Sequence, residues 1–94
     1  VSATDSGVVV TWEDSTADGH GLGILAALRD SAGAPLGSDI LVNSQVFDDQ
    51  LSPAIVSGPD GRIFAAWITR WTTGPQWAIS FQVMDAKLTK TQYP

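Results

Sequence analysis

The sequence predicts an all-β chain built from repeated four-stranded antiparallel units, and three features predict it. The first is an internal repeat, because Trp12 and Trp67, like Asp30 and Asp85, lie 55 positions apart. The second is that apolar residues alternate with polar ones or run continuously over short segments, as in β-strands. The third is that Gly, Pro and Asp gather between these segments, where they favour tight turns.

The repeat holds over the whole overlap of the chain with itself. With Val1 set on Val56, the 39 overlapping positions (94 minus 55) align without a gap. Seven of these positions carry the same residue in both copies. In the first copy they are Val1, Ser2, Asp5, Trp12, Gly19, Ile24 and Asp30. A period of this length is typical of propellers and solenoids. We therefore divide the chain into a first partial repeat, residues 1–51, and a second, residues 52–94.

Each unit is predicted to contain four strands in antiparallel order. The expected strands are Ala54–Ser57, Arg62–Thr69 and Ala78–Asp85 in the second copy, and Asp39–Asn43 as the fourth strand of the first copy. Four such strands form one blade of a β-propeller, so 94 residues at 55 per unit correspond to about 1.7 antiparallel blade repeats. The alternative is a small β-sandwich, which does not require a 55-residue repeat.

The second strand of each unit is predicted to be an inner strand. Val8–Trp12 and Ile63–Ile68 are apolar at successive positions, which indicates burial between two layers. Because Trp12 and Trp67 occupy equivalent positions in these strands, we expect both to be packing residues.

The segment Ser52–Trp67 resembles the strand, turn and strand of sialidase-like and related bacterial secreted propellers, and Asp30–Gly37 followed by Ile40–Asn43 resembles the rest of such a blade. The resemblance implies the fold more than an activity. The sialidase Asp-box is not met, because Trp12 lies too far beyond the Asp5-Ser6-Gly7 core. With one Tyr and one Glu in the chain, no catalytic residues can be carried over from the sialidases.

Composition restricts the partners and the location. Ten acidic against five basic residues give a net charge of -5, which would repel a phosphate backbone, so we expect no nucleic acid partner. The longest apolar run, Gly23–Leu28, is too short for a spanning helix. Few Lys and many Gly, Ser, Thr and Asp are typical of exported bacterial β proteins, which predicts an extracellular, periplasmic or cell-surface location.

Antiparallel order places the loop between the second and third strands, and the connection to the next unit, at one rim of the blades. This rim would carry Glu13, Asp14, Asp18, His20, Phe47, Asp48, Asp49, Gln50, Arg70, Trp71, Gln76 and Trp77. From this set we predict a ligand or partner site made of Arg70, Trp71, Gln76, Trp77, Asp48 and Asp49. Trp71 and Trp77 have no aromatic counterparts in the first copy, and exposed aromatic rings suit sugar faces or protein hot spots. The alternative is that each folds back over the blade edge.

Acidic residues at the same rim suggest a cation site. Asp14 and Asp18, together with Asp48 and Asp49, could gather around calcium, which prefers several oxygen ligands. Turn chemistry alone explains these acids adequately and is the favoured alternative. His20 is the only histidine, and with no cysteine in the chain a zinc site is not expected.

Two functions are consistent with these observations. The first is a non-catalytic binding or assembly module of an exported bacterial protein or complex, either carbohydrate-binding or a structural subunit. The second is a fragment of a sialidase-like propeller glycosidase whose catalytic residues lie outside this chain. The lack of a plausible catalytic carboxylate pair favours the first. Because both blades are incomplete, the expected partners are copies of the chain or a larger polypeptide that completes the propeller.

Overall fold

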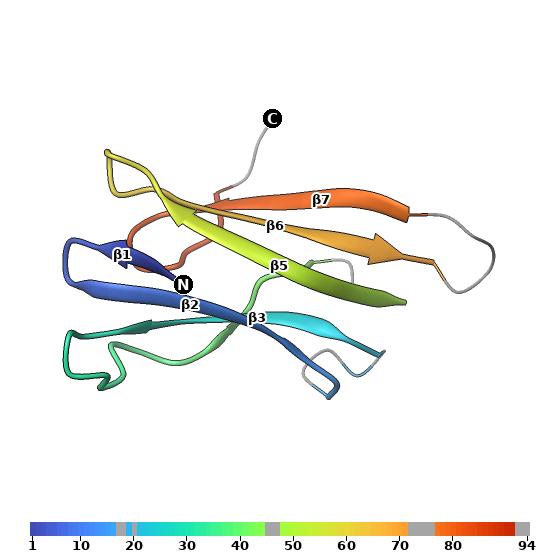
Figure 1. The fold of residues 1–94 in the computed structure, drawn as a ribbon, viewed down its shortest axis with the longest axis horizontal. Coiled ribbons are helices and arrows are strands. Elements are labelled where there is room, and N and C mark those ends of the chain that lie inside the picture. The colour runs from blue at the N-terminus through green and yellow to red at the C-terminus, as the bar shows by residue number, and fades with distance from the viewer. Residues whose placement is uncertain (17–18, 20, 45–47, 72–76, 92–94) are drawn as a thin grey trace.

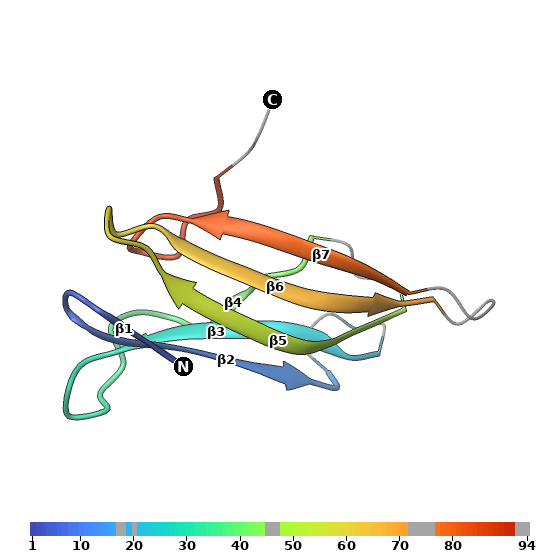
Figure 2. The ribbon, with the colours of Figure 1, turned by 45° about the horizontal axis from the view of Figure 1, so that its top comes forward.

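The computed structural model describes residues 1–16, 19, 21–44, 48–71 and 77–91. The described residues form seven strands and no helix: β1 (Ser2–Thr4), β2 (Gly7–Asp14), β3 (Gly23–Arg29), β4 (Ile40–Leu41), β5 (Asp49–Ser57), β6 (Ile63–Arg70) and β7 (Trp77–Met84). They are arranged in two antiparallel sheets, ordered β1-β2-β3-β4 and β5-β6-β7 (Figures 1 and 2). The prediction of an all-β antiparallel chain is confirmed.

Strand β5 begins earlier than the sequence predicts. It starts at Asp49 rather than at Ala54 and contains an irregularity between Leu51 and Ala54, where the pairing with β6 shifts register. Ser52 adopts a left-handed conformation there, with φ 54°. A β-bulge accommodates Pro53, which has no N–H to donate to a ladder. The proline therefore marks a bulge within the strand and not its boundary.

The pairing of the second and third strands is the same in both sheets. Val8 pairs with Arg29 in the first sheet, and Ile63 pairs with Met84 in the second. Each residue of the second pair lies 55 positions after the corresponding residue of the first pair. The register between the first and second strands of the repeat differs by one residue between the two sheets. Ser2 pairs with Val9, whereas Ser57, its counterpart, pairs with Ile63, the counterpart of Val8. The connections also differ, with residues 5–6 between β1 and β2 and residues 58–62 between β5 and β6.

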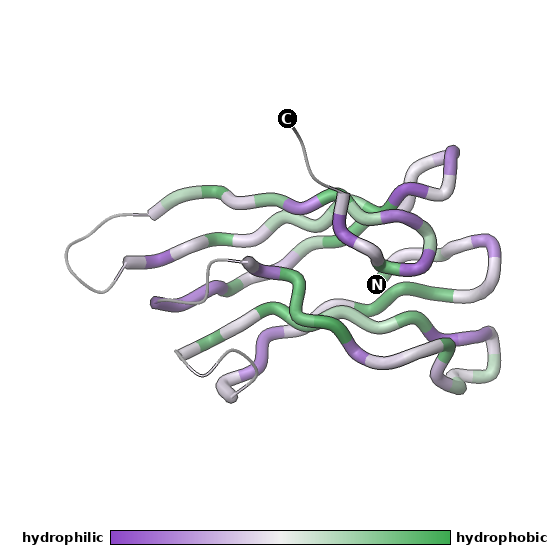
Figure 3. Tube along the Cα trace, turned by 180° about the vertical axis from the view of Figure 1, so that it is seen from behind, coloured by the Kyte–Doolittle hydropathy of each residue, from purple (hydrophilic) through white to green (hydrophobic). Residues whose placement is uncertain are grey.

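The two sheets stack face to face, and the hydrophobic core lies between them. The first sheet contributes Val9, Ile24, Ala26, Leu28 and Val42, and the second contributes Ile63, Ala65, Trp67 and Met84. Hydrophobic residues follow the strands, while the turns at the strand ends are more hydrophilic (Figure 3). Burial of these side chains between the layers is the main source of stability.

The expectation that both inner strands are buried on two faces is wrong for the chain as it stands. Two stacked sheets cover only one face of each strand. Trp67 faces the core and is 6% exposed, whereas Trp12 is half-buried on the opposite face of its own sheet. On β6, Phe64 points away from the core and is 40% exposed.

Candidate binding surfaces

One end of the molecule corresponds to the predicted rim. The end of β2, the start of β3 and the start of β5 lie together at this end, beside the end of β6 and the start of β7 (Figure 1). The turns that connect β1 to β2 and β5 to β6 lie at the other end (Figure 1). The alternation follows from the antiparallel order of consecutive strands.

Three of the predicted site residues form a row across the second sheet at this rim. Asp49 pairs with Arg70, and Arg70 pairs with Trp77, on neighbouring strands. The Arg70 guanidinium donates to Asp49 Oδ2 over 2.6 Å and lies 5.7 Å from the centre of the Trp77 ring. A cation over an indole face is attracted by the ring electrons. Arg70 therefore joins an acid and an exposed aromatic ring into one surface.

Asp49 also joins the two sheets. Its Oδ1 accepts a hydrogen bond of 3.0 Å from the Leu22 N–H, and the Gln50 N–H donates to the Leu22 carbonyl over 2.8 Å. The Leu22 amide, followed by the Arg70 guanidinium, holds the pKa of Asp49 below its ordinary value. Gly21 permits this close approach, because a Cβ there would lie 2.5 Å from Asp49 Oδ1.

Of the other predicted site residues, two flank this row in the sequence and one lies outside the described residues. Asp48 precedes β5 in a left-handed conformation, with φ 64°, and Trp71 is half-buried directly after β6. Gln50 is buried, and its Oε1 accepts a hydrogen bond of 3.3 Å from the Thr69 hydroxyl, so it is not a surface residue. Gln76, Asp18, His20 and Phe47 lie outside the described residues.

The rim acids of the first sheet have structural partners. Glu13 Oε2 accepts a hydrogen bond of 3.1 Å from the Ser52 N–H, so it supports the bulge of β5 across the sheets. Asp14 Oδ1 accepts hydrogen bonds from both the N–H and the hydroxyl of Thr16, at 2.8 and 2.9 Å. Within the described part of the chain, no three His, Cys, Asp or Glu side chains gather as a metal site would require.

A larger surface was not predicted as a site. The face of the second sheet that points away from the core, here called the outer face, carries Val56, Phe64, Ile79 and Phe81, which are 55%, 40%, 74% and 67% exposed. Phe64 and Phe81 border an open hollow of about 370 Å³, and Ile79 and Trp77 border another of about 190 Å³. Contiguous exposed apolar residues mark interaction sites in soluble proteins. The signal was present in the sequence, in the apolar residues on both faces of β6.

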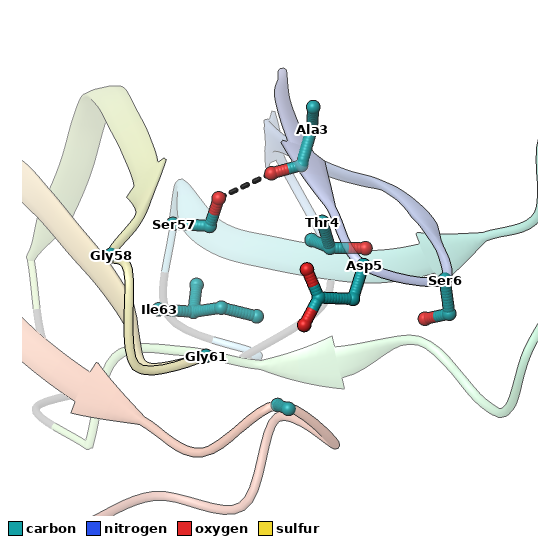
Figure 4. A pocket seen from close by; sticks show the side chains of 9 residues that line it. Ala3, Thr4, Asp5, Ser6, Ser57, Gly58, Gly61 and Ile63 are labelled. Carbon is teal, nitrogen blue, oxygen red and sulfur yellow. Dashed lines mark hydrogen bonds between the residues drawn. The ribbon is translucent and has the colours of Figure 1, made fainter.

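A cavity with a mixed polar and apolar lining lies at the opposite end from the rim. It has a volume of about 230 Å³ and is lined by Ala3, Thr4, Asp5, Ser6, Ser57, Gly58, Gly61, Ile63 and Ala86 (Figure 4). The Ser57 hydroxyl donates to the Ala3 carbonyl across the gap between β5 and β1 (Figure 4). Thr4 Oγ1 is buried and has no hydrogen-bond partner among the described residues.

Comparison with known proteins adds no identification. No family model, curated protein or solved structure matches the chain. Among the described residues there is no helix of the length and hydrophobicity needed to cross a membrane.

Proposed function

We propose that this chain is a non-catalytic assembly module, whose sheets stack with the sheets of further copies in a larger all-β assembly. The observation that carries the proposal is the outer face, where Phe64, Ile79 and Phe81 lie in water although each is an apolar core-type side chain. Removing such side chains from water stabilises an association by roughly 25 cal/mol for each Å² of apolar surface buried. An exposed apolar surface of this kind marks a site that another protein surface covers.

The finer proposal is that each sheet is one blade of a β-propeller. Its support is the meander order of the strands and the register of the second and third strands, which recurs at an offset of 55 residues. Stacking of sheets along one direction, with connections alternating between two ends, is the arrangement from which propellers are built. The composition supports an exported bacterial protein as the setting of this module.

Sedimentation equilibrium tests the assembly function directly. We expect the apparent mass to rise above the 9.9 kDa of a single chain as the concentration increases through the micromolar range. Ile79→Asp should restore the single-chain mass, because a charge in the outer face would be buried on association. A wild-type mass that stays at 9.9 kDa throughout would refute the proposal.

A second candidate function is ligand contact at the rim, favoured by the Arg70 and Trp77 pair. Trp77 is 57% exposed and the Arg70 guanidinium lies 5.7 Å from the centre of its ring, so an exposed aromatic surface lies beside a charge. Such a surface suits the apolar face of a sugar ring or an aromatic hot spot of a partner protein. A glycan array probed with the wild type and with Trp77→Ala tests this function, since binding that the substitution does not weaken would exclude Trp77 as its site.

A further inference from the structure

The repeat identifies what kind of surface fits the outer face. Phe64, Ile79 and Phe81 of the outer face stand 55 positions after Val9, Ile24 and Ala26. These three counterparts are fully buried in the core between the two sheets. The same face of the repeating unit is therefore covered in the first sheet and uncovered in the second.

The surface that covers the first sheet is also part of the repeat. It includes the inward-facing side chains of β6, which are Ile63, Ala65 and Trp67, exposed by only 1%, 2% and 6%, together with Met84 of β7 and Ile55 of β5. The counterparts of the three β6 residues, 55 positions earlier, are Val8, Val10 and Trp12, which lie on the far face of the first sheet and are half-buried. We call this set the rear face.

One chain thus contains one complete interface between sheets, which is its core. It also carries both surfaces of a second such interface, the outer face and the rear face, which do not contact each other. The outer face and the rear face lie on opposite sides of the stacked pair of sheets, so they cannot meet within one chain. The basic residues of both surfaces have acidic partners: Arg29, which lies on the rear face at the position equivalent to buried Met84, is within 3.9 Å of Asp39, and Arg70 at the rim of the outer face is paired with Asp49. Ile68 replaces Glu13 at the equivalent position, which makes the outer face more apolar than its buried counterpart.

We propose that the outer face of one copy binds the rear face of a second copy, so that the contact between copies repeats the contact between the two sheets inside the chain. The proposal rests on the assembly function proposed above and adds the identity of both surfaces and the head-to-tail direction. It assigns Val10 and Ile79 to opposite sides of one interface between copies.

Cross-linking between single-cysteine variants tests the direction. The chain contains no cysteine, so Val10→Cys and Ile79→Cys each introduce one reactive site. Stacked sheets lie about 10 Å apart, within the reach of a short bis-maleimide. We expect a mixture of the two variants, one of them isotopically heavy, to give mainly Val10→Cys with Ile79→Cys dimers. Ser31→Cys, in an exposed turn, serves as the control and should not be cross-linked to either variant.

The outcomes separate this inference from the proposed function. Predominant cross-linking of Ile79→Cys with itself would show that two outer faces meet, which would overturn the head-to-tail inference and leave the assembly function standing. Absence of cross-links together with a single-chain mass would overturn both. Independently, Trp12→Asp and Ile79→Asp should each weaken self-association roughly tenfold or more, while a mixture of the two variants should retain one intact interface and form dimers.

Discussion

Asp85 accepts the same side-chain hydrogen bonds as Asp30, although it lies 55 positions further along the chain. In each turn Oδ1 accepts from the backbone N–H groups two and four residues further on, and all four distances are 2.9 Å. In each turn the Asp N–H also donates to the carbonyl four residues later, again over 2.9 Å. Two turns of different sequence are thus organised by one carboxylate each, because Asp can replace backbone acceptors in a tight turn.

The same turns differ at their left-handed position. Gly33 occupies it in the first turn with φ 88°, and Leu88 occupies it in the second with φ 65°. A leucine in this conformation is strained by roughly 1–2 kcal/mol. Leu88 is 5% exposed and belongs to the core, so burial of its side chain offsets the strain.

The two equivalent tryptophans should contribute unequally to stability. We expect Trp67→Ala to lower the free energy of unfolding by roughly 3–5 kcal/mol, because it leaves a large cavity in the core. Trp12→Ala should cost clearly less in the single chain, because its side chain is only half-buried. Urea unfolding at a concentration too low for self-association measures both. Equal losses at that concentration would contradict the placement of Trp12 on the rear face.

The bond between Asp49 and Arg70 should make stability depend on pH. Since folding lowers the pKa of Asp49 below its ordinary 3.8, its contribution is complete above that value and disappears as the pH falls through the lower folded pKa. Asp49→Asn should therefore lower stability at neutral pH by about 1 kcal/mol or less, and the difference from the wild type should vanish in strong acid.

Asp60→Asn provides a matched control for this experiment. Asp60 forms an ion pair of 3.2 Å with Arg62, but both side chains are more than half exposed. Its substitution should leave the free energy of unfolding nearly unchanged. If Asp49→Asn behaved like Asp60→Asn from pH 7 downwards, the link between the sheets through Asp49 would carry no stability.

The hydroxyl of Thr4 should destabilise the fold. It is buried without a partner among the described residues, and such a group costs about 1–3 kcal/mol. We expect Thr4→Val to raise the free energy of unfolding by about 1 kcal/mol. Thr11→Val should have the opposite sign, because the Thr11 hydroxyl donates to the Leu25 carbonyl over 2.8 Å. Stabilisation by both substitutions would indicate a general preference for Val in strands and would contradict the argument.

Trp77 should matter for binding and little for folding. Because the side chain is 57% exposed, Trp77→Ala should change the free energy of unfolding by about 0.5 kcal/mol or less. It should weaken contact with a sugar or partner protein by about 1–3 kcal/mol, the range for an interfacial aromatic. Leu36→Ala, at an exposed apolar residue in the turn after β3, should change neither quantity. Loss of cooperative unfolding in Trp77→Ala would place Trp77 in the core.

The strands were predictable because their patterns are local. The alternation of apolar and polar residues predicted β7, and a continuous run of apolar residues predicted β6. Both ends of each strand were predicted to within one residue. The start of β5 was missed, because Pro53 interrupts the pattern and the bulge that accommodates it depends on a tertiary contact, the hydrogen bond from the Ser52 N–H to Glu13.

The candidate site was predictable in part. The rim location followed from antiparallel order, and Asp49, Arg70 and Trp77 were correctly placed together there. The role of Asp49 in joining the sheets could not be predicted from the sequence, because its partner is the backbone N–H of Leu22. Nearly every residue type has a backbone N–H, so the residue type at position 22 does not indicate this bond. The outer face was not predicted as a site either. Apolar residues on both faces of a strand indicate that both faces are buried, but they do not indicate which face is covered by the same chain and which by another surface.

The stacking of the two sheets also defines a rotation. When an interface pairs two unlike faces, adding a copy does not end the assembly. In the stacking proposed above, each new copy carries another uncovered outer face. Growth stops only when the successive rotations add up to a full turn and the last copy meets the first; otherwise the same contacts produce a filament. In the assembly proposed above, the volume of the side chains between stacked sheets, Trp67 within a chain and Trp12 between copies, would set the wedge angle of each step. In such an assembly a substitution there that leaves every strand intact decides between a closed ring and an endless fibre.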